Sequence, residues 1–498
     1  MCLSFFHLTS CITRELKNYV YFNIYVSMCF NKARSLILKM NWETIFTTQR
    51  VGQEKESPGP RSGFQRDFDR LIFSSSFRRL QNKTQVFPLP GSTFVHNRLT
   101  HSLEVASVGR SLGSMTGEKI SRETADKNSD TYEFYRYELA NVVAAGCLAH
   151  DIGNPAFGHS GEKAISAYFI DNAHSKIDGR ELQSFFTEKE WADISNFEGN
   201  ANAIRILTHT FKGRLIGGLG LTYTTIASIL KYPCEATAIN KQFKHRKKYG
   251  FFQAEINAIH AIATKLGLRR EDSDAVIYQR HPFVYLVEAA DDICYSIIDM
   301  EDANRLGILS HEIVKESFLH VIKCLDAGKK EENRTLEIYN KIGDLNEKIG
   351  YLRSKAINLL TMRAADVFND NRQQILAGTF NDTLVDNIEN SCGALTELLK
   401  ISNEKIYNHD TVLEVEIAGY NVMSELLNLF VPALLKKNPG HKDQKVLKLF
   451  PQQFREFEET ESPYEKVLNA FDLISGMTDL YATEMYRKLK GVEIPQHR

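Results

Sequence analysis

The chain has 498 residues, enough for one large domain or roughly two to four ordinary ones. Hydrophobic residues make up 43% and charged residues 25%, which is typical of a soluble globular protein with a buried core. The formal net charge is −1, so no overall field holds the chain on nucleic acid or on an anionic membrane. A polyanionic ligand must therefore meet a local basic group, and one lies at Lys241, Lys244, Arg246, Lys247 and Lys248.

Cysteine spacing and the first residues bear on the compartment. The eight cysteines include no CxxC pair, which favours neither a zinc ribbon nor a disulfide framework and indicates the cytoplasm. Residues 1–39 form an atypical leader whose apolar run, 18–30, is too short to span a bilayer. An ordinary sequence, MNWETIF, begins at Met40, so we expect translation to start there. A genuine extra segment and a signal peptide are the alternatives, and we expect no membrane association.

From Arg61 onward the sequence predicts mainly helices. Residues 83–87 (KTQVF) are one of few strand signals and could form an arm of a short hairpin. Leu103, Ala106 and Leu112 predict a buried helix over 101–112. A second apolar helix is predicted over 139–149, with Gly153 in the turn that ends it.

The second half of the chain continues this helical pattern. Residues 283–298 predict an apolar helix that carries a polar insertion at Asp291 and Asp292. Apolar residues from Ile342 to Leu359 recur in steps of three and four, the pattern of a coiled-coil seam. Because this seam covers fewer than three heptads, we expect an intramolecular helical hairpin. A last helix is predicted near residues 467–474.

Three separated segments place side chains typical of metal ligands in apolar helices: His101, the pair His150 and Asp151, and Asp291. Taken singly, a helical His is more often a hydrogen-bonded core residue, and a His-Asp pair can be a charge pair at a helix end. Two adjacent carboxylates in a buried helix are costly, however, unless they are paired or bind a metal. The segments together favour a divalent ion, and imidazole with carboxylate suits Mn, Mg, Co, Ni or Fe.

The order H…HD…D resembles the signature of the HD superfamily, and longer blocks resemble the deoxyguanosine triphosphate triphosphohydrolases. These blocks are RDFDRLIFSSSFRRLQNKTQVF from Arg66, NRLTHSLEV, HDIGNPAFGHSGE, NFEGNANAIRIL, EAADDICYSIIDMEDA and SGMTDLYATEMYRKLKG from Ser475. Ala156 and Asn202 depart from the family pattern, in which we expect Pro and Gln. The resemblance implies an all-α fold with an HD catalytic core over 40–307. It also implies a helical C-terminal region, 308–498, that packs on the core and contributes to oligomerisation.

The resemblance implies metal-dependent hydrolysis of a deoxynucleoside triphosphate, dGTP above others, to the deoxynucleoside and inorganic triphosphate. It assigns the metal to His101, His150, Asp151 and Asp291, the scissile bond to His159, and the orientation of His159 to Glu162. It also implies a homo-oligomer, with a hexamer favoured. The alternatives are an HD phosphohydrolase of another nucleotide and a non-catalytic sensor of dNTPs or single-stranded nucleic acid.

Substrate-binding residues are also implied by the resemblance: Gln85, Tyr295 and Asp299 at the sugar, and Arg98, Asn154, Lys231, Tyr232 and Lys248 as further contacts, mainly to the phosphates. Tyr295 and Asp299 follow Asp291 by four and eight residues, so the three share one helical face. Tyr295 beneath the sugar would leave no room for a 2′-hydroxyl. Its alternative role is a core aromatic, while a surface Lys is usually solvated and Asn154 suits an ordinary turn.

Overall fold

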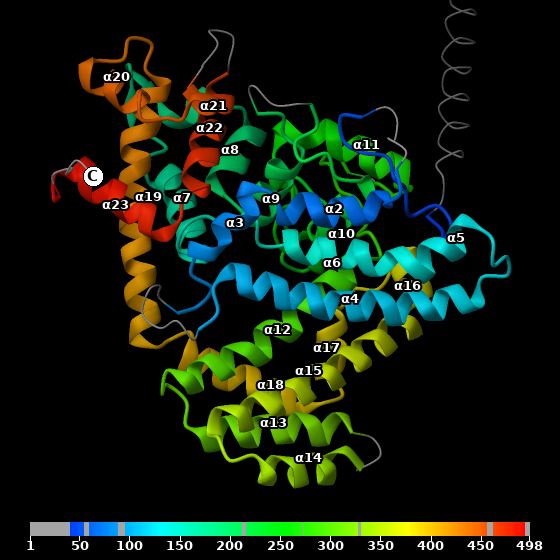
Figure 1. Cartoon of the computed structure of the whole chain (residues 1–498). Helices are drawn as coiled ribbons and strands as arrows, with labels where there is room; N and C mark the ends of the chain where they lie inside the picture. The colour runs from blue at the N-terminus through cyan, green and yellow to red at the C-terminus, as the bar shows by residue number, and fades with distance from the viewer. Residues whose placement is uncertain are drawn as a thin grey trace, which may run out of the picture.

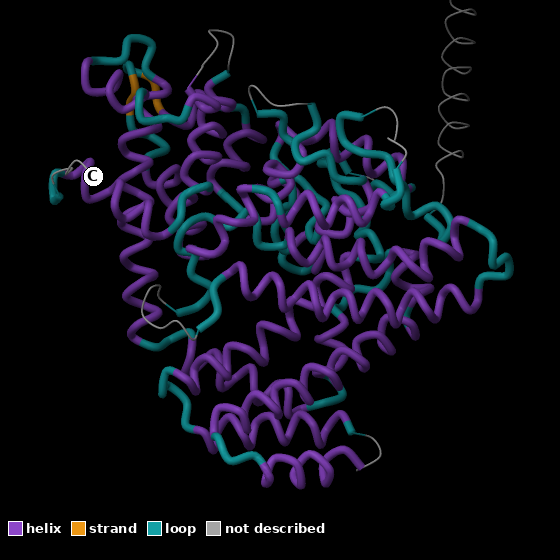
Figure 2. The backbone as a smooth tube through the Cα atoms, viewed as in Figure 1, coloured by secondary structure: helices purple, strands orange, loops and turns teal. Residues whose placement is uncertain are grey.

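The computed structural model describes residues 40–53, 59–87, 95–211, 216–271, 273–326, 330–455 and 462–493. The expectation about residues 1–39 lies outside this range. Helices dominate the described residues, which confirms the all-α prediction (Figure 1). Their one sheet is an antiparallel pair of two-residue strands, β1 (Lys176–Ile177) and β2 (Arg180–Glu181). Figure 2 shows this pair beside the loop that precedes α20 (His441–Leu447).

The helices follow one another along the chain with short connections. The first half contains α2 (Gly63–Ile72), α3 (Ser75–Arg78), α4 (Arg98–Glu123), α5 (Asp130–Glu133), α6 (Leu139–Ala149), α7 (Gly158–Asp171), α8 (Glu188–Ser195), α9 (Gly199–Thr208), α10 (Tyr223–Ile229) and α11 (Ile256–Leu266). The second half contains α12 (Val284–Arg305), α13 (His311–Leu325), α14 (Lys330–Lys341), α15 (Leu345–Asp370), α16 (Arg372–Ala377), α17 (Leu384–Glu389), α18 (Gly393–Ile401), α19 (Asp410–Leu435), α20, α21 (Gln452–Arg455), α22 (Pro463–Ser475) and α23 (Asp479–Lys490).

Two hydrophobic cores organise these helices. The first gathers α4, α6, α12 and α15, and the second gathers α7, α19 and α22. Small residues bring α4 and α6 close together: a Cβ atom on Gly113 would lie 2.8 Å from the Cα atom of Ala140. Side chains of the second core include Phe169, Phe430 and Phe471. In Figure 1, α19 stands along one side of the molecule, beside α7 and α22.

Most predicted helices are confirmed, and one has the predicted bounds. The helix over 139–149 is α6, while the segments 101–112, 283–298 and 467–474 lie largely within α4, α12 and α22. The placement of Leu103 in the core is wrong, because its side chain is 43% exposed. Gly153 also differs from the prediction, since it lacks the left-handed backbone of a helix-ending glycine. A Cβ atom there would collide with α9, at Gly199 and Ala203.

Of the two hairpin predictions, the β-hairpin arm is wrong and the helical hairpin is confirmed. Residues 83–87 contribute only an isolated bridge, Thr84 to Asn97, so the described residues contain no regular hairpin arm there. The helical hairpin of the second half is confirmed, because α13 and α14 both pack against α15. Its seam is shorter than predicted: Ile342 lies in the turn before α15, whose N-cap is Asp344, and Leu345 is 58% exposed.

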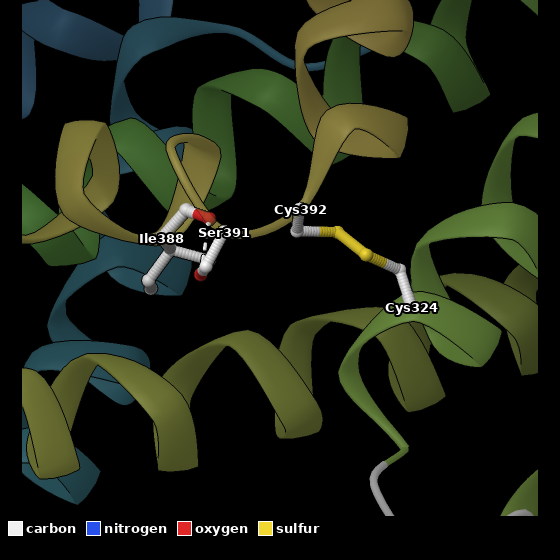
Figure 3. Close-up of a disulfide and its surroundings, with 4 residues drawn as sticks. All are labelled: Cys324, Ile388, Ser391 and Cys392. Carbon is white, nitrogen blue, oxygen red and sulfur yellow. Dashed lines mark hydrogen bonds between the residues drawn. A yellow bond between two sulfur atoms is a disulfide. The ribbon is translucent and has the colours of Figure 1, made fainter.

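One disulfide links the end of α13 to the residue before α18, a pair that the cysteine spacing did not predict. Cys324 and Cys392 have Cα atoms 5.8 Å apart (Figure 3). The adjoining turn is closed by the Ser391 hydroxyl, which donates to the Ile388 carbonyl at 2.9 Å (Figure 3). Three other cysteines, Cys147, Cys234 and Cys294, are free and buried.

Helix α19 is long and apolar enough to cross a membrane by length and composition alone, the one such helix in the described part of the chain. Half of its most apolar window is buried inside the molecule. It packs on α7, α20 and α22, as a core helix does. Packing within the protein thus covers part of its apolar surface, while Leu413, Ile417 and Tyr420 remain exposed.

Candidate metal centre and nucleotide cavity

A cavity of about 660 Å³ opens where helices of the two cores meet. Eleven of the fourteen predicted site residues line it: Gln85, Arg98, His150, Asp151, Asn154, His159, Lys231, Tyr232, Lys248, Asp291 and Tyr295. The other three, His101, Glu162 and Asp299, are buried behind these residues and contact them or their neighbours. The volume is in the range of a small-molecule site.

The four predicted metal ligands converge on one wall of this cavity. His101 comes from the first turn of α4, His150 and Asp151 follow the end of α6, and Asp291 comes from α12. The Asp291 Oδ1 atom lies 3.0 Å from His101 Nε2 and 3.4 Å from His150 Nε2. Ligand atoms of His101, His150 and Asp151 all lie within 4.8 Å of one another. A single ion could therefore meet these three side chains, and the Asp291 carboxylate lies against both histidine rings.

Hydrogen bonding fixes the His150 ring in a form suited to a metal. Its Nδ1 atom lies 2.6 Å from the Cys147 carbonyl oxygen, which can only accept, so Nδ1 carries the proton. The Nε2 atom is buried and has no hydrogen-bond partner in the described part of the protein. A buried polar atom without a partner is costly, and a neutral imidazole held in this way is a common metal ligand. The residues present thus fit a divalent cation.

In the candidate metal centre, burial and the neighbouring charges shift the pKa of each group in opposite directions. Burial lowers the pKa of His150, but the carboxylates of Asp151 and Asp291 outweigh it and bring that pKa to about 9. Burial raises the pKa of Asp151, but Arg98, His150 and His101 outweigh it and bring that pKa to about 2. The carboxylates of Asp151 and Asp291 are therefore ionised at neutral pH, as metal ligands must be, whereas His150 carries a second proton, on Nε2, that a bound cation would displace.

The pair His159 and Glu162 lies at the start of α7, on the second core. His159 Nδ1 is 2.9 Å from Glu162 Oε2, and the His159 side chain is 70% exposed toward the cavity and solvent. The other Glu162 oxygen accepts the Gly199 backbone N–H at 2.8 Å. Burial raises the pKa of Glu162, but His159 and Lys248 outweigh it and keep it below its ordinary value. An ionised Glu162 thus orients His159 and leaves Nε2 for proton transfer.

Arg98 and Asn154 both hold Asp151. An Arg98 guanidinium nitrogen donates to Asp151 Oδ2 at 2.6 Å, and the Asn154 amide donates to Oδ1 at 2.5 Å. Arg98 is 5% exposed and lines the cavity, with its Nε atom buried and unpaired. Asn202, one of the two departures from the family pattern, donates to the Gly153 carbonyl and so braces the same loop.

The predicted sugar residues occupy another part of the wall. Gln85 has a buried side-chain oxygen that accepts no hydrogen bond from the described residues. Tyr295 stacks on Tyr407, with ring centroids 5.4 Å apart and planes 14° apart. Asp299 is 4% exposed and does not line the cavity; its carboxylate accepts the Tyr407 hydroxyl at 2.8 Å. Burial raises the pKa of Asp299 to about 8.

The cavity cations are partly neutralised. Lys231 Nζ lies 3.3 Å from Glu288, and Lys248 Nζ lies 2.8 Å from Glu198. Lys247 and Lys163 also line the cavity. Lys244, elsewhere in the basic run, is paired with Asp386 at 2.7 Å.

Sequence reasoning missed the contribution of the C-terminal region to this wall. Tyr407 and, from α19, Val412, Val415 and Glu416 line the cavity, as do Phe157 and Asn200. The α19 residues recur at helical spacing, which in sequence is indistinguishable from ordinary helix packing. Lys247 could have been found from the sequence, because it belongs to the basic run. No sequence pattern pointed to Tyr407.

Comparison with known proteins agrees with this geometry. A family model described as HD domain matches residues 98–221, a range that includes His101, His150 and Asp151 but ends before Asp291. The chain is thus an HD-domain protein.

Three curated relatives extend the similarity to most of the chain. Proteins named deoxyguanosinetriphosphate triphosphohydrolase-like protein from Synechocystis sp. and Pseudomonas aeruginosa are each 38% identical to it. They cover 91% and 92% of this chain, and all of each relative is matched. The deoxyguanosinetriphosphate triphosphohydrolase of Salmonella typhimurium is 33% identical over 86% of this chain and 94% of its own length. The chain therefore belongs to the deoxyguanosine triphosphate triphosphohydrolase family, as its motifs implied.

Proposed function

We propose that the protein hydrolyses a deoxynucleoside triphosphate, preferentially dGTP, to the deoxynucleoside and inorganic triphosphate. The observation that carries the proposal is the cavity itself. It places the convergent set of His101, His150, Asp151 and Asp291 on one wall and the His159–Glu162 pair on another. Family membership and the names of the relatives support the same reaction.

In this proposal His101, His150, Asp151 and Asp291 hold a divalent ion. When bound, the ion supplies positive charge at the phosphoryl group and makes a nearby water more acidic. The chain's own cations, Arg98, Lys231 and Lys248, add charge along the triphosphate. Arg98 already lies 2.6 Å from Asp151, so it connects the metal wall to the phosphate wall.

Water attacks the α-phosphorus, and the bond from phosphorus to the 5′-oxygen breaks. The departing oxygen needs a proton. His159 is oriented for this transfer because Glu162 and Gly199 fix its Nδ1 side, and its Nε2 atom then delivers the proton. Asn154 keeps Asp151 in place and so acts through the metal wall.

Sugar selection follows from Gln85, Tyr295 and Tyr407. The unpaired Gln85 oxygen can accept a sugar hydroxyl, which removes the cost of its burial. The Tyr295 ring, fixed by stacking on Tyr407, closes the space that a 2′-hydroxyl would need. Asp299 supports this wall by holding the Tyr407 hydroxyl. Tyr232 adds an aromatic edge to the cavity.

The preference for guanine rests on the relatives and on Glu416. This half-buried carboxylate lines the cavity and has no hydrogen bond or ion pair within the described residues. Guanine is the base that presents two neighbouring N–H donors on its pairing edge, and a carboxylate accepts such a pair with both oxygens.

The test is a screen of the purified protein against the four dNTPs and the four corresponding NTPs, with Mn, Mg, Co, Ni and Fe in turn. Release of inorganic triphosphate from dGTP above the other substrates supports the proposal. Release of orthophosphate or diphosphate, or equal turnover of GTP, would contradict it. Light scattering of the same sample tests the proposed homo-oligomer, for which we expect a hexamer.

A further inference from the structure

A carboxylate from the end of the chain reaches the wall of the nucleotide cavity. Asp479 opens the last helix, α23, and is only 7% exposed. One of its oxygens accepts the Thr84 backbone N–H at 2.8 Å, and the other accepts the Phe157 backbone N–H at 2.9 Å. Thr84 immediately precedes Gln85, and Phe157 lies two residues before His159. Asp479 therefore ties together two distant segments that carry cavity residues.

A second contact joins the same three segments. The Lys83 ammonium is 2% exposed and donates to the carbonyl oxygens of Asn154 and Ser475, both at 2.6 Å. Burial lowers the pKa of Lys83 to about 7, and a buried amine is costly in either protonation state unless it is hydrogen-bonded, so these contacts are not incidental. Hydrogen bonds from backbone N–H groups to a carboxylate are among the stronger kinds. The segments around residues 84, 157 and 479 thus form one connected unit.

The backbone conformation of Phe157 explains why the hydrogen bonds of Asp479 matter. Phe157 has a φ of 61°, a left-handed conformation that is strained for a residue with a side chain. It is the N-cap of α7 but caps the helix with no side-chain hydrogen bond. The next residue, Gly158, lies against Arg98, because a Cβ atom there would be 2.5 Å from a guanidinium nitrogen. The position of His159 in the first turn of α7 is therefore set by this strained turn.

We propose that Asp479 is a positioning residue, whose two hydrogen bonds set where His159 and Gln85 stand in the cavity. The proposal rests on the proposed function for its kinetic consequence. Asp479 does not line the cavity; it acts through the backbone of Thr84 and Phe157. The proposal also gives a role to the C-terminal block SGMTDLYATEMYRKLKG, which has no other part in the proposed reaction.

The test compares Asp479→Asn with Asp479→Glu. The Asn side chain has the same shape but only one acceptor oxygen, so its amide NH2 must face one of the two backbone donors. We expect kcat for dGTP to fall roughly tenfold or more, with KM and bound metal little changed. Asp479→Glu keeps both acceptors one methylene farther away, and we expect an intermediate kcat. Asp130→Asn, at the first position of the exposed helix α5, is the matched control and should leave kcat unchanged.

A second readout does not depend on turnover. The exposed His159 ring can be modified by diethyl pyrocarbonate, and mass spectrometry of its peptide gives the rate as a function of pH. We expect the rate profile of His159 to shift in Asp479→Asn, while that of the exposed His174 stays fixed. Because the modification of His159 needs no turnover, it tests the positioning role of Asp479 even if the wild-type protein does not catalyse the proposed reaction.

Two results would overturn the proposal. One is a folded Asp479→Asn protein whose kcat and His159 profile match those of the wild type. The other is an Asn variant that does not fold together with a Glu variant that is indistinguishable from the wild type in both readouts. The second result would make Asp479 a structural residue only.

Discussion

His150 Nδ1 lies 2.6 Å from the carbonyl oxygen of Cys147, one turn earlier in the chain, and this contact turns the opposite ring nitrogen toward Asp291. The backbone at the end of α6 thereby orients the ring of a candidate ligand. In the proposed metal site, the geometry of His150 depends on the way in which the apolar helix α6 ends.

Replacement of His150 or Asp151 by Ala is expected to abolish hydrolysis, by at least about 100-fold, and to lower the bound metal. Each change removes a ligand from a set of four, and in Asp151→Ala it also removes the partner of Arg98. Elemental analysis and kcat for both variants are the measurements. His174→Ala, an exposed histidine outside the cavity, is the control. Full activity in His150→Ala would exclude this site.

Tyr295→Ala is expected to lower the preference for dGTP over GTP, because it opens the space beside C2′ and removes the partner of Tyr407. The measurement is the ratio of kcat/KM for the two nucleotides, together with the melting temperature. Tyr137→Ala, at an exposed position, controls for loss of an aromatic residue. An unchanged ratio in a folded Tyr295→Ala protein would mean that the sugar is recognised elsewhere.

Glu416→Gln is expected to reduce kcat/KM for dGTP roughly tenfold while affecting dATP less, since an amide offers one acceptor and one donor where guanine presents two donors. The competing outcome is an equal loss for all four dNTPs, which would place Glu416 at the phosphates or the sugar instead. The four kcat/KM values, measured in parallel, decide between them.

We expect the free energy of unfolding to depend on pH through the titration of Asp299. Burial raises the pKa of this carboxyl from an ordinary value near 4 to about 8, so the folded state holds its proton more tightly than the unfolded state does. Its contribution to stability is therefore fully present below about pH 4 and is lost as the pH rises through about 8.

Asp299→Asn cannot ionise and should show a weaker decline in the free energy of unfolding across that range. The difference should exceed about 1 kcal/mol, since each pKa unit corresponds to about 1.4 kcal/mol. Denaturant unfolding of both proteins at several pH values measures it. Parallel declines in the two proteins would show that Asp299 keeps an ordinary pKa.

Much of this structure was predictable from local patterns. The run of small and apolar residues over 139–149 matches the bounds of α6, because an apolar run of 11 residues is longer than a typical buried strand and suits a buried helix. His101, His150, Asp151 and Asp291 were predicted as ligands because polar ligand-type groups in apolar helices are costly without a partner. They do converge, as residues drawn from three helices.

The parts that could not be predicted depend on contacts between distant segments. Leu103 looked like a core position, yet its side chain is 43% exposed. Tyr407 enters the cavity because the helical turn Ser402–Ile406 packs on α12 and α18, and Glu416 enters it because α19 packs on α7; the sequence contains no sign of that packing. Asp479 is similar, because its hydrogen-bond partners, Thr84 and Phe157, lie more than 300 residues earlier in the chain. Local patterns thus identify ligands better than they identify the residues that position them.

The central claim is that water attacks the α-phosphorus and releases the triphosphate whole. Hydrolysis of dGTP in water enriched in oxygen-18, followed by mass spectrometry of the products, tests it most directly. We predict one labelled oxygen in inorganic triphosphate and none in deoxyguanosine. Label in deoxyguanosine, or in orthophosphate or diphosphate formed in place of triphosphate, would contradict the account.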